Sequence, residues 1–420
     1  MINHYGGIFK INRLEQSVVQ EYIVNKVDQN ILKIKNTGAL SNIERCKDTL
    51  KEDKVAYLFS LLDLEFDLSK QDEINEMVEK YFNIIIDKKI GNIDYQEDYD
   101  YILSREKEIK TSLSYPKYLL LKLDISLHKE LNDIDYEFIF DILMEHKEYL
   151  EKYQISNLYY NKGLYYLDKF DYQEALYWFE QAENYNMPTN YKGMLYFHKS
   201  TLYGIIGEYF LAIETANKAK NYFDQILCYK KSIACYFKSG IYFSKNGDFD
   251  KARSIYNYSI IKSKEFGRED LLPLIRNNMC WIDIRCKDYQ SLVDNANELL
   301  KYNSGNPESY FYLAWGYEHL NQKSKANENI KLAMKYNNHC DIYMAKMITI
   351  YSHKFSLKSK VENIKRDLYQ LYRSMRKNNF DCSATLFVIE MLIEVCHENH
   401  DYKQENDYLK EYMEFSLKKK

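Results

Sequence analysis

The sequence predicts an all-α fold, and three observations support this prediction. The 420 residues include only 4 Pro and 13 Gly, and these are too few turn-forming residues for a chain rich in β-hairpins. Apolar residues recur at helical spacing, as in 119–127 and 138–143,. Small residues also recur at intervals of 34 to 40 residues, which indicates stacked helical pairs that bury their apolar faces against one another.

Composition narrows the class of protein further. The net charge of -4 gives no overall basic character, so any contact with nucleic acid must be local,. The longest apolar runs are far shorter than a membrane span, and the first residues lack the apolar stretch of a signal peptide,. The 8 Cys form no CxxC pair, so we expect reduced thiols. These features favour a cytoplasmic protein with no membrane contact.

The stretch 154–188 shows the repeated unit most clearly. Its pattern predicts two amphipathic helices joined by the turn DKFDY. Gly163 and Ala175, one on each helix, are small enough for two antiparallel backbones to approach closely. Aligning later segments on Ala175 gives the anchors Ala212, Ala252, Leu292 and Ala326. Twelve residues before the five anchors stand Gly163, Ser200, Gly240, Cys280 and Ala314, and seven residues after them stand Ala182, Ala219, Ser259, Leu299 and Ala333.

This pattern resembles the tetratricopeptide repeat, a helix–turn–helix unit with small residues at the helix crossings. The resemblance covers 154–338 and implies a right-handed superhelical solenoid whose first helices line a concave groove. Residues 339–420 are interpreted as degenerate repeats with a C-terminal cap. Residues 69–153 lack the small-residue pattern and are interpreted as irregular helical hairpins that lead into the array. Tyr115-Pro116 marks a break there.

Residues 1–68 differ from the repeats. We expect a first helix in GGIFKINRLEQ, a second opened by Ser17 as N-cap, a short helix near Leu40 and a longer one over 55–67,. The run Leu40-Ser41-Asn42-Ile43-Glu44, followed by basic residues, resembles the recognition helix of Xre-type helix-turn-helix domains. Cys46 stands where that family has Gly, and the segment before Ser41 is several residues longer than usual.

That resemblance implies a DNA contact surface. A recognition helix needs short polar side chains to reach base edges and cations to hold phosphates. The expected DNA-binding residues are Gln20, Lys33, Lys35, Ser41, Asn42, Arg45 and Lys47. The alternative interpretation is a solvated helix face on a helical cap.

The repeat register also places residues in the expected groove. An Asn amide there can pair with both the N–H and the C=O of an extended peptide. Lysine and arginine can bind a ligand carboxylate, and aromatic residues such as Trp315 supply flat walls. The expected peptide-binding residues are Asn161, Lys238, Asn277, Asn278, Trp281, Arg285 and Tyr312. The competing interpretation places the aromatic residues in the core between repeats.

Catalysis, cofactors and metal binding find no support in the sequence. The 9 His occur singly, without an HExxH motif,. No Gly-rich phosphate-binding loop is present. We therefore expect a protein that is not an enzyme and has neither cofactor nor metal site.

An Xre-type domain followed by tetratricopeptide repeats resembles the peptide-pheromone receptors of Gram-positive bacteria, the RNPP group. The resemblance implies quorum sensing by a transcription regulator that works as a homodimer, binds a short signalling peptide in its groove and thereby changes its binding to double-stranded DNA. The alternative is an interaction protein with a vestigial helix-turn-helix, whose groove sequesters or scaffolds a partner protein.

Overall fold

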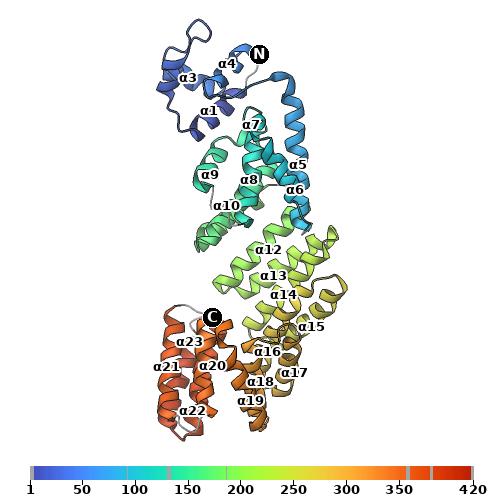
Figure 1. Ribbon diagram of the computed structural model, residues 1–420, viewed down its shortest axis with the longest axis vertical. Coiled ribbons are helices and arrows are strands. Elements are labelled where there is room, and N and C mark those ends of the chain that lie inside the picture. Colours follow the sequence, from blue (N-terminus) through green and yellow to red (C-terminus); the bar gives the residue numbers. More distant parts are fainter. Residues whose placement is uncertain are drawn as a thin grey trace. The chain divides into compact units, whose positions relative to one another are not determined.

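The computed structural model in Figure 1 describes residues 4–91, 93–129, 134–185, 187–355, 360–378 and 382–417. Within these ranges the secondary structure is helical, without a β-strand, so the predicted all-α class is confirmed. No helix in the described ranges is both long and apolar enough to cross a membrane. The chain divides into two compact units, residues 1–202 with 221–228 and residues 203–220 with 229–420.

Four helices form the N-terminal part of the first unit. They are α1 (Tyr5–Glu15), α2 (Gln20–Lys26), α3 (Thr37–Glu44) and α4 (Glu52–Ser60). Their core includes Phe9, Ile43 and Phe59, with the rings of Phe9 and Phe59 edge to face at 6.0 Å. α1 and α2 both pack against α3, so α3 is supported from two sides.

A second group of helices follows in the first unit. After a 3-10 turn (Leu68–Lys70) come α5 (Gln71–Gly91), α6 (Gln96–Ser104), α7 (Glu106–Ile109), α8 (Tyr115–Lys129), α9 (Tyr136–Glu145) and a 3-10 turn at Lys147–Tyr149. α8 begins at the predicted break before Pro116. The long helix α5 packs against α6, α7 and α8.

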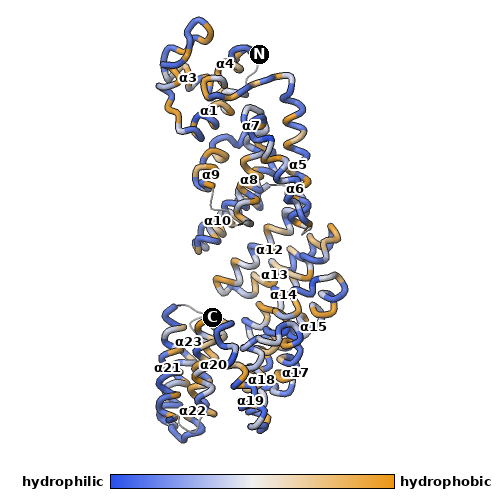
Figure 2. Tube along the Cα trace, in the orientation of Figure 1, coloured by the Kyte–Doolittle hydropathy of each residue, from blue (hydrophilic) through white to orange (hydrophobic). Residues whose placement is uncertain are grey.

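Most of the remaining helices pack against their neighbour in the chain. The remaining helices are α10 (Lys152–Asp168), α11 (Tyr172–Glu183), α12 (Thr189–Ile206), α13 (Tyr209–Gln225), α14 (Tyr229–Lys245), α15 (Phe249–Glu265), α16 (Leu272–Cys286), α17 (Tyr289–Leu300), α18 (Pro307–His319), α19 (Lys323–Lys335), α20 (Ile342–Ser352), α21 (Val361–Lys377), α22 (Cys382–Glu398) and α23 (Tyr402–Leu417). For example, α10 packs against α11 and α14 packs against α15. Short 3-10 turns occur at Glu269–Leu271, Asn337–His339 and His353–Phe355. Figure 2 shows apolar and polar residues alternating along these helices, as expected where one face of each is buried,.

Small residues allow the helices of a pair to pack closely, as the sequence predicted. A Cβ added to Gly163 would lie 2.5 Å from Cδ1 of Phe179, and one added to Gly240 would lie 2.7 Å from Cδ1 of Tyr256. The aromatic ring of the second helix therefore lies directly on the glycine of the first. The five anchor residues are all fully buried.

Three of the turns within pairs use the same helix cap. A residue with positive φ precedes an aspartate that caps the second helix, as at Phe170 (φ 61°) before Asp171 and Lys287 (φ 56°) before Asp288. Asp171 accepts a hydrogen bond from the backbone N–H of Glu174 at 3.2 Å. Such a side-chain cap satisfies one of the unpaired donors at a helix start.

Two predictions about the N-terminal helices are wrong in detail. Ser17 is not an N-cap, because it has a left-handed backbone (φ 56°) in the turn and Val19 caps α2. The helix predicted over 55–67 is α4, which begins at Glu52 and ends at Ser60. The domain limits predicted after residues 68, 153 and 338 remain predictions, since the two compact units are a coarser division. The seven cysteines whose side chains are described are free thiols.

Candidate functional site

A buried ion pair fixes the position of α3. Arg13 Nε donates to Glu44 Oε1 at 2.6 Å and Nη2 donates to Oε2 at 3.1 Å. Both side chains are almost completely buried, and Gln20 Nε2 adds a third donor to Glu44 at 2.7 Å. α1, α2 and α3 are thus tied together through one carboxylate. Pairing of this kind, with every partner satisfied, is what allows charge to remain in a core.

The predicted DNA-binding residues separate into two groups. Gln20 and Ser41 contact each other, with Gln20 Nε2 donating to Ser41 Oγ at 3.0 Å, so these side chains hold α2 against α3. The others are exposed, and within the described residues no hydrogen bond or ion pair holds their side chains. They are Lys33, Lys35, Asn42, Arg45 and Lys47. Asn42 and Arg45 lie one turn apart on the outer face of α3.

The segment between α2 and α3 is longer than a tight turn and has its own pattern. Leu32 and Ile34 are buried while Ile31, Lys33 and Lys35 are exposed. Alternation with a period of two is typical of extended chain anchored on one side. Lys33 and Lys35 therefore share one outward side immediately before α3.

Cys46 explains one departure from the Xre-type pattern. Its backbone is left-handed (φ 55°), which is the conformation for which a Gly would be expected after a helix,. Its Sγ lies 3.6 Å from the hydroxyl of Tyr149, and this hydroxyl also donates to the carbonyl oxygen of His4. A Cβ on Gly7 would collide with the same hydroxyl. Tyr149 thus joins the N-terminal helices to the segment that leads into α10.

Asn161 lies in the interior of the first unit. Its side chain is completely buried and Nδ2 donates to Asp124 on α8 at 3.4 Å and to Asn157 at 3.2 Å. Lys89 from α5 forms an ion pair with the same Asp124. The expected position of Asn161 on an open groove is therefore wrong for this conformation, because α5 and α8 supply polar partners that cover it. Among the described residues, its Oδ1 has no hydrogen-bond partner.

Four of the predicted peptide-binding residues meet on α16 and α18 in the second unit. The Tyr312 hydroxyl donates to Asn277 Oδ1 at 3.0 Å, and the Trp281 ring is edge to face with Tyr312 at 5.7 Å. Arg285 lies one helical turn beyond Trp281. Tyr312 is fully buried, so it supports this surface and does not face a ligand directly.

Helices α22 and α23 also contribute side chains to this surface. The Phe387 ring lies 5.4 Å from that of Trp281 and 4.9 Å from that of Trp315. Arg285 forms an ion pair with Glu390, and its Nη2 donates to the Tyr412 hydroxyl at 2.9 Å. The arginine predicted to hold a ligand carboxylate is thus held by a glutamate of the chain itself.

A cavity of about 670 Å³ opens beside this arginine. Its walls include the aromatic residues Tyr289, Trp315, Phe387 and Tyr412, together with groups of both charges. The charged and titratable lining residues are Arg285, Lys287, His319, Glu390, Glu394, His397 and Glu405. The volume lies within the range of about 300–1,000 Å³ that is usual for ligand pockets.

His319 connects α18 to α22 at the wall of this cavity. Its Nδ1 lies 2.9 Å from the carbonyl oxygen of Trp315 and its Nε2 lies 3.1 Å from Glu394 Oε1. A carbonyl and a carboxylate can only accept, so satisfying both bonds requires an imidazolium. Burial by itself lowers the pKa of His319, but the bonds to Glu394 and to the Trp315 carbonyl, together with the charges of Glu394 and Glu318, outweigh burial and the pKa is raised.

The other two predicted peptide-binding residues, Lys238 and Asn278, are described separately from this cluster. Lys238 on α14 is partly buried, and burial lowers its pKa to about 8. Asn278 on α16 is partly exposed, and within the described residues no hydrogen bond holds its side chain. The acidic and histidine residues of α22 and α23 were not predicted, because these helices carry a degenerate repeat pattern that does not reveal which of their faces turns inward.

Comparisons with known proteins agree with this architecture. The sequence matches no family model and no curated protein. The structure is similar to the apo form of the quorum sensor NprR from B. thuringiensis, with 16% identity, a TM-score of 0.61 and coverage of 82% of this chain and 99% of that chain. The apo form of RapI gives 14% identity, a TM-score of 0.65 and coverage of 82% and 98%.

A third solved structure shows the same fold. A Rap protein complexed with competence and sporulation factor is also similar, with 12% identity, a TM-score of 0.57 and coverage of 83% of this chain and 99% of that chain. The expected helical-repeat solenoid fold is thereby confirmed. At these identities the similarity concerns the fold alone.

Proposed function

We propose that this protein is a peptide-responsive regulator that binds a short signalling peptide at the inner surface of its repeats and thereby changes its binding to double-stranded DNA. The observation that carries the proposal is the cavity beside Arg285. It combines aromatic walls with an arginine, a lysine and several carboxylates, and a short peptide presents apolar side chains together with charged ends. A solved NprR in complex with its cognate peptide NprX has a similar fold, with 16% identity and a TM-score of 0.50.

The surface of α3 supports the DNA-binding part of the proposal. The buried pair of Arg13 and Glu44 holds the helix in place, and the exposed Asn42 and Arg45 lie together on its outer face. Lys33 and Lys35 add cations beside the start of the helix. This combination provides a polar group for base edges and cations for phosphates. A homodimer would present two such helices to paired half-sites.

The mechanism requires the peptide to favour one conformation. A ligand can shift an equilibrium only by its difference in affinity for the two states. Arg285 offers such a difference, since it can hold either Glu390, as in this structure, or a carboxylate of the peptide. Exchange of one carboxylate for the other would change how α22 is held against α16.

A second function is favoured by the charge of residues 1–68. Nine Lys and Arg stand against ten Asp and Glu, a net charge of -1, whereas DNA-binding domains are usually basic. In this alternative the N-terminal helices bind a partner protein, and the repeats still bind a peptide.

The first test separates these two functions by a charge change just after the C-terminal end of α3. We expect the double variant R45E/K47E to lose binding to DNA from its own locus by about 100-fold, because two phosphate contacts become repulsive. Fluorescence anisotropy at several salt concentrations measures this loss. The matched control K331E/K335E makes the same charge change on α19 and should bind as the unchanged protein does. Equal DNA binding by all three proteins would exclude this surface as the DNA contact, and no DNA binding by the unchanged protein would exclude the DNA-binding function.

The second test concerns the peptide. Synthetic peptides of about five to ten residues (a length range taken from the RNPP resemblance) are made from any small secreted reading frame beside the gene and titrated by calorimetry. We expect saturable binding that is weakened about tenfold in R285M, because a bidentate carboxylate contact is lost. Binding that is unchanged in R285M would refute the assignment of this cavity.

A further inference from the structure

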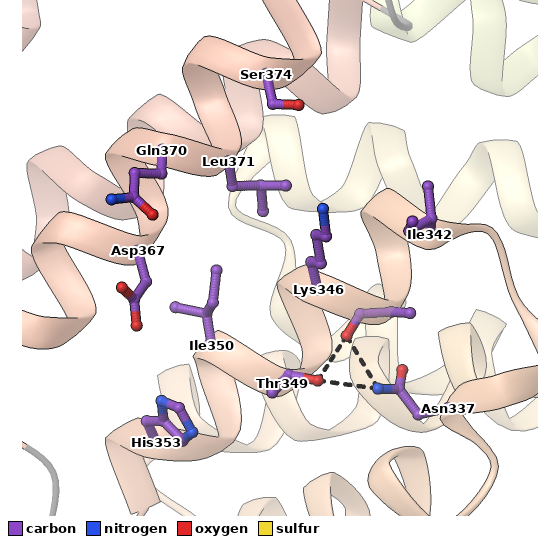
Figure 3. A pocket seen from close by; sticks show the side chains of 11 residues that line it. Asn337, Ile342, Lys346, Thr349, Ile350, His353, Asp367, Gln370, Leu371 and Ser374 are labelled. Atoms are coloured by element: carbon purple, nitrogen blue, oxygen red, sulfur yellow. Dashed lines mark hydrogen bonds between the residues drawn. The ribbon is translucent and has the colours of Figure 1, made fainter.

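We propose that the cleft between α20 and α21 is a second ligand site, which binds a small hydrophobic carboxylate. Figure 3 shows this cleft, with Lys346 and Ile350 from α20 and Leu371 from α21 pointing into it. Its volume is about 400 Å³, within the range of ligand pockets,. It lies on the face of α20 opposite the buried Met347 and Ile348, apart from the cavity beside Arg285.

The cleft has no aromatic ring in its lining, unlike the space beside Gly240. In α14 and α15 the ring of Tyr256 lies on Gly240, so no space remains at the crossing. The cleft of α20 and α21 is lined by residues that include Ala345, Thr349, Leu371 and Ser374, and no Phe, Tyr or Trp is among its lining residues. An apolar group of a ligand can fill this space.

In one corner of the cleft the polar side chains already have hydrogen-bond partners within the protein. Asn337 Nδ2 donates to the Ala345 carbonyl and to Thr349 Oγ1, each at 3.0 Å, and Thr349 Oγ1 donates to the same carbonyl at 2.8 Å. Figure 3 shows these bonds as dashed lines. This corner forms a rigid wall, and its polar groups do not need a ligand.

The rest of the rim offers donors without partners. Lys346 is exposed, and within the described residues its ammonium has no hydrogen bond or ion pair; the same holds for the side chains of Gln370 and Ser374. Asp367, the one acid of the lining, is paired with Arg366 at 3.0 Å. Ile342, which is 64% exposed, adds an apolar side chain to this rim. Free donors beside an apolar floor fit a carboxylate attached to a hydrocarbon group.

The two helices also carry a local positive charge. α20 contains one Lys and no acid, while α21 contains five Lys and Arg against two acids. Their sum is +4, in a chain whose net charge is -4. Lys365 is buried and paired with Asp401, and the remaining excess of positive charge attracts an anion to this pair of helices.

The test compares three probes that share one branched hydrocarbon body. N-acetyl-L-leucine represents the C-terminal residue of a chain, 4-methylpentanoate represents a free acid, and N-acetyl-L-leucinamide lacks the carboxylate. We expect the two acids to shift the methyl resonances of Ile342 and Ile350, at ligand concentrations of about a millimolar, and to leave Ile330 unmoved. The amide should bind at least tenfold more weakly. The tighter of the two acids identifies the source of the ligand.

Variants assign the binding to this cleft. K346M should weaken both acids at least tenfold, whereas the control K331M, an exposed lysine on α19, should not. R285M should leave these shifts unchanged, which separates this site from the proposed peptide cavity. Absence of shifts with either acid, equal binding of the amide, or unchanged binding in K346M would each overturn the proposal.

Discussion

Two pairs of helices in the second unit differ in how their crossing is filled. In α14 and α15 a buried tyrosine lies on Gly240, and the pair is closed. In α20 and α21 a cleft of about 400 Å³ remains, lined by Ala345 and Ser374 among others and by no aromatic ring. The two pairs thus differ in the space that their side chains leave between the helices. Sites arise where the packing rule of the repeat is not followed.

The closed pair should be the more sensitive to added volume. In G240L the new side chain would have to occupy the space of the Tyr256 ring, which is fully buried and cannot move into solvent. We expect a loss of about 3 kcal/mol in the free energy of unfolding of this unit, since overpacking forces strained side chains and backbone shifts. Urea unfolding followed by tyrosine fluorescence and circular dichroism measures it.

Gly305 provides the matched control. A Cβ at this position would have its nearest neighbours at 3.7 Å, so G305L should change the unfolding free energy by less than about 1 kcal/mol. If the two variants are equally stable, the tight crossing at Gly240 does not contribute as described.

The link between α16 and the last pair should have an intermediate effect. R285M removes the ion pair with Glu390 and the bond to the Tyr412 hydroxyl. We expect a loss of about 1–2 kcal/mol, because Glu390 is left partly buried without its partner. Hydrogen exchange should show faster exchange in α22 and α23 and little change in α14. R285K, which keeps the charge without the planar fork, should lie between R285M and the unchanged protein.

The sequence predicted the repeats because the spacing of small residues is set by packing within a single helical pair. Gly163, Gly240 and the buried alanines each act within one pair, so spacing alone reveals them. It could not predict the burial of Asn161, which depends on Asp124 and Lys89 from helices outside the repeat pattern. Nor could it predict that Arg285 meets Glu390, more than one hundred residues along the chain. Contacts between distant segments have no periodic signal.

A smaller, pH-dependent effect is expected at His319. The pKa of His319 is raised in the folded protein, so its stabilising contribution is fully present below the unfolded pKa of about 6.5 and is lost as the pH rises through the raised value. In H319Q this dependence should disappear, and the difference from the unchanged protein should be about 1 kcal/mol at pH 6 and smaller at pH 9. Thermal unfolding midpoints over this pH range measure it. A difference that grows with pH would contradict the imidazolium assignment.

The open pair should tolerate what the closed pair does not. A345L adds a branched side chain to the cleft between α20 and α21, where no ring competes for the space. We expect the unfolding free energy to stay within about 1 kcal/mol of the original, and to rise if the new methyl groups bury apolar surface against Ile350 and Leu371. The same variant should lose the shifts caused by N-acetyl-L-leucine, because the side chain occupies the ligand's place. The new side chain and the ligand would thus occupy the same volume. If A345L remained stable and still bound N-acetyl-L-leucine, the ligand would lie elsewhere.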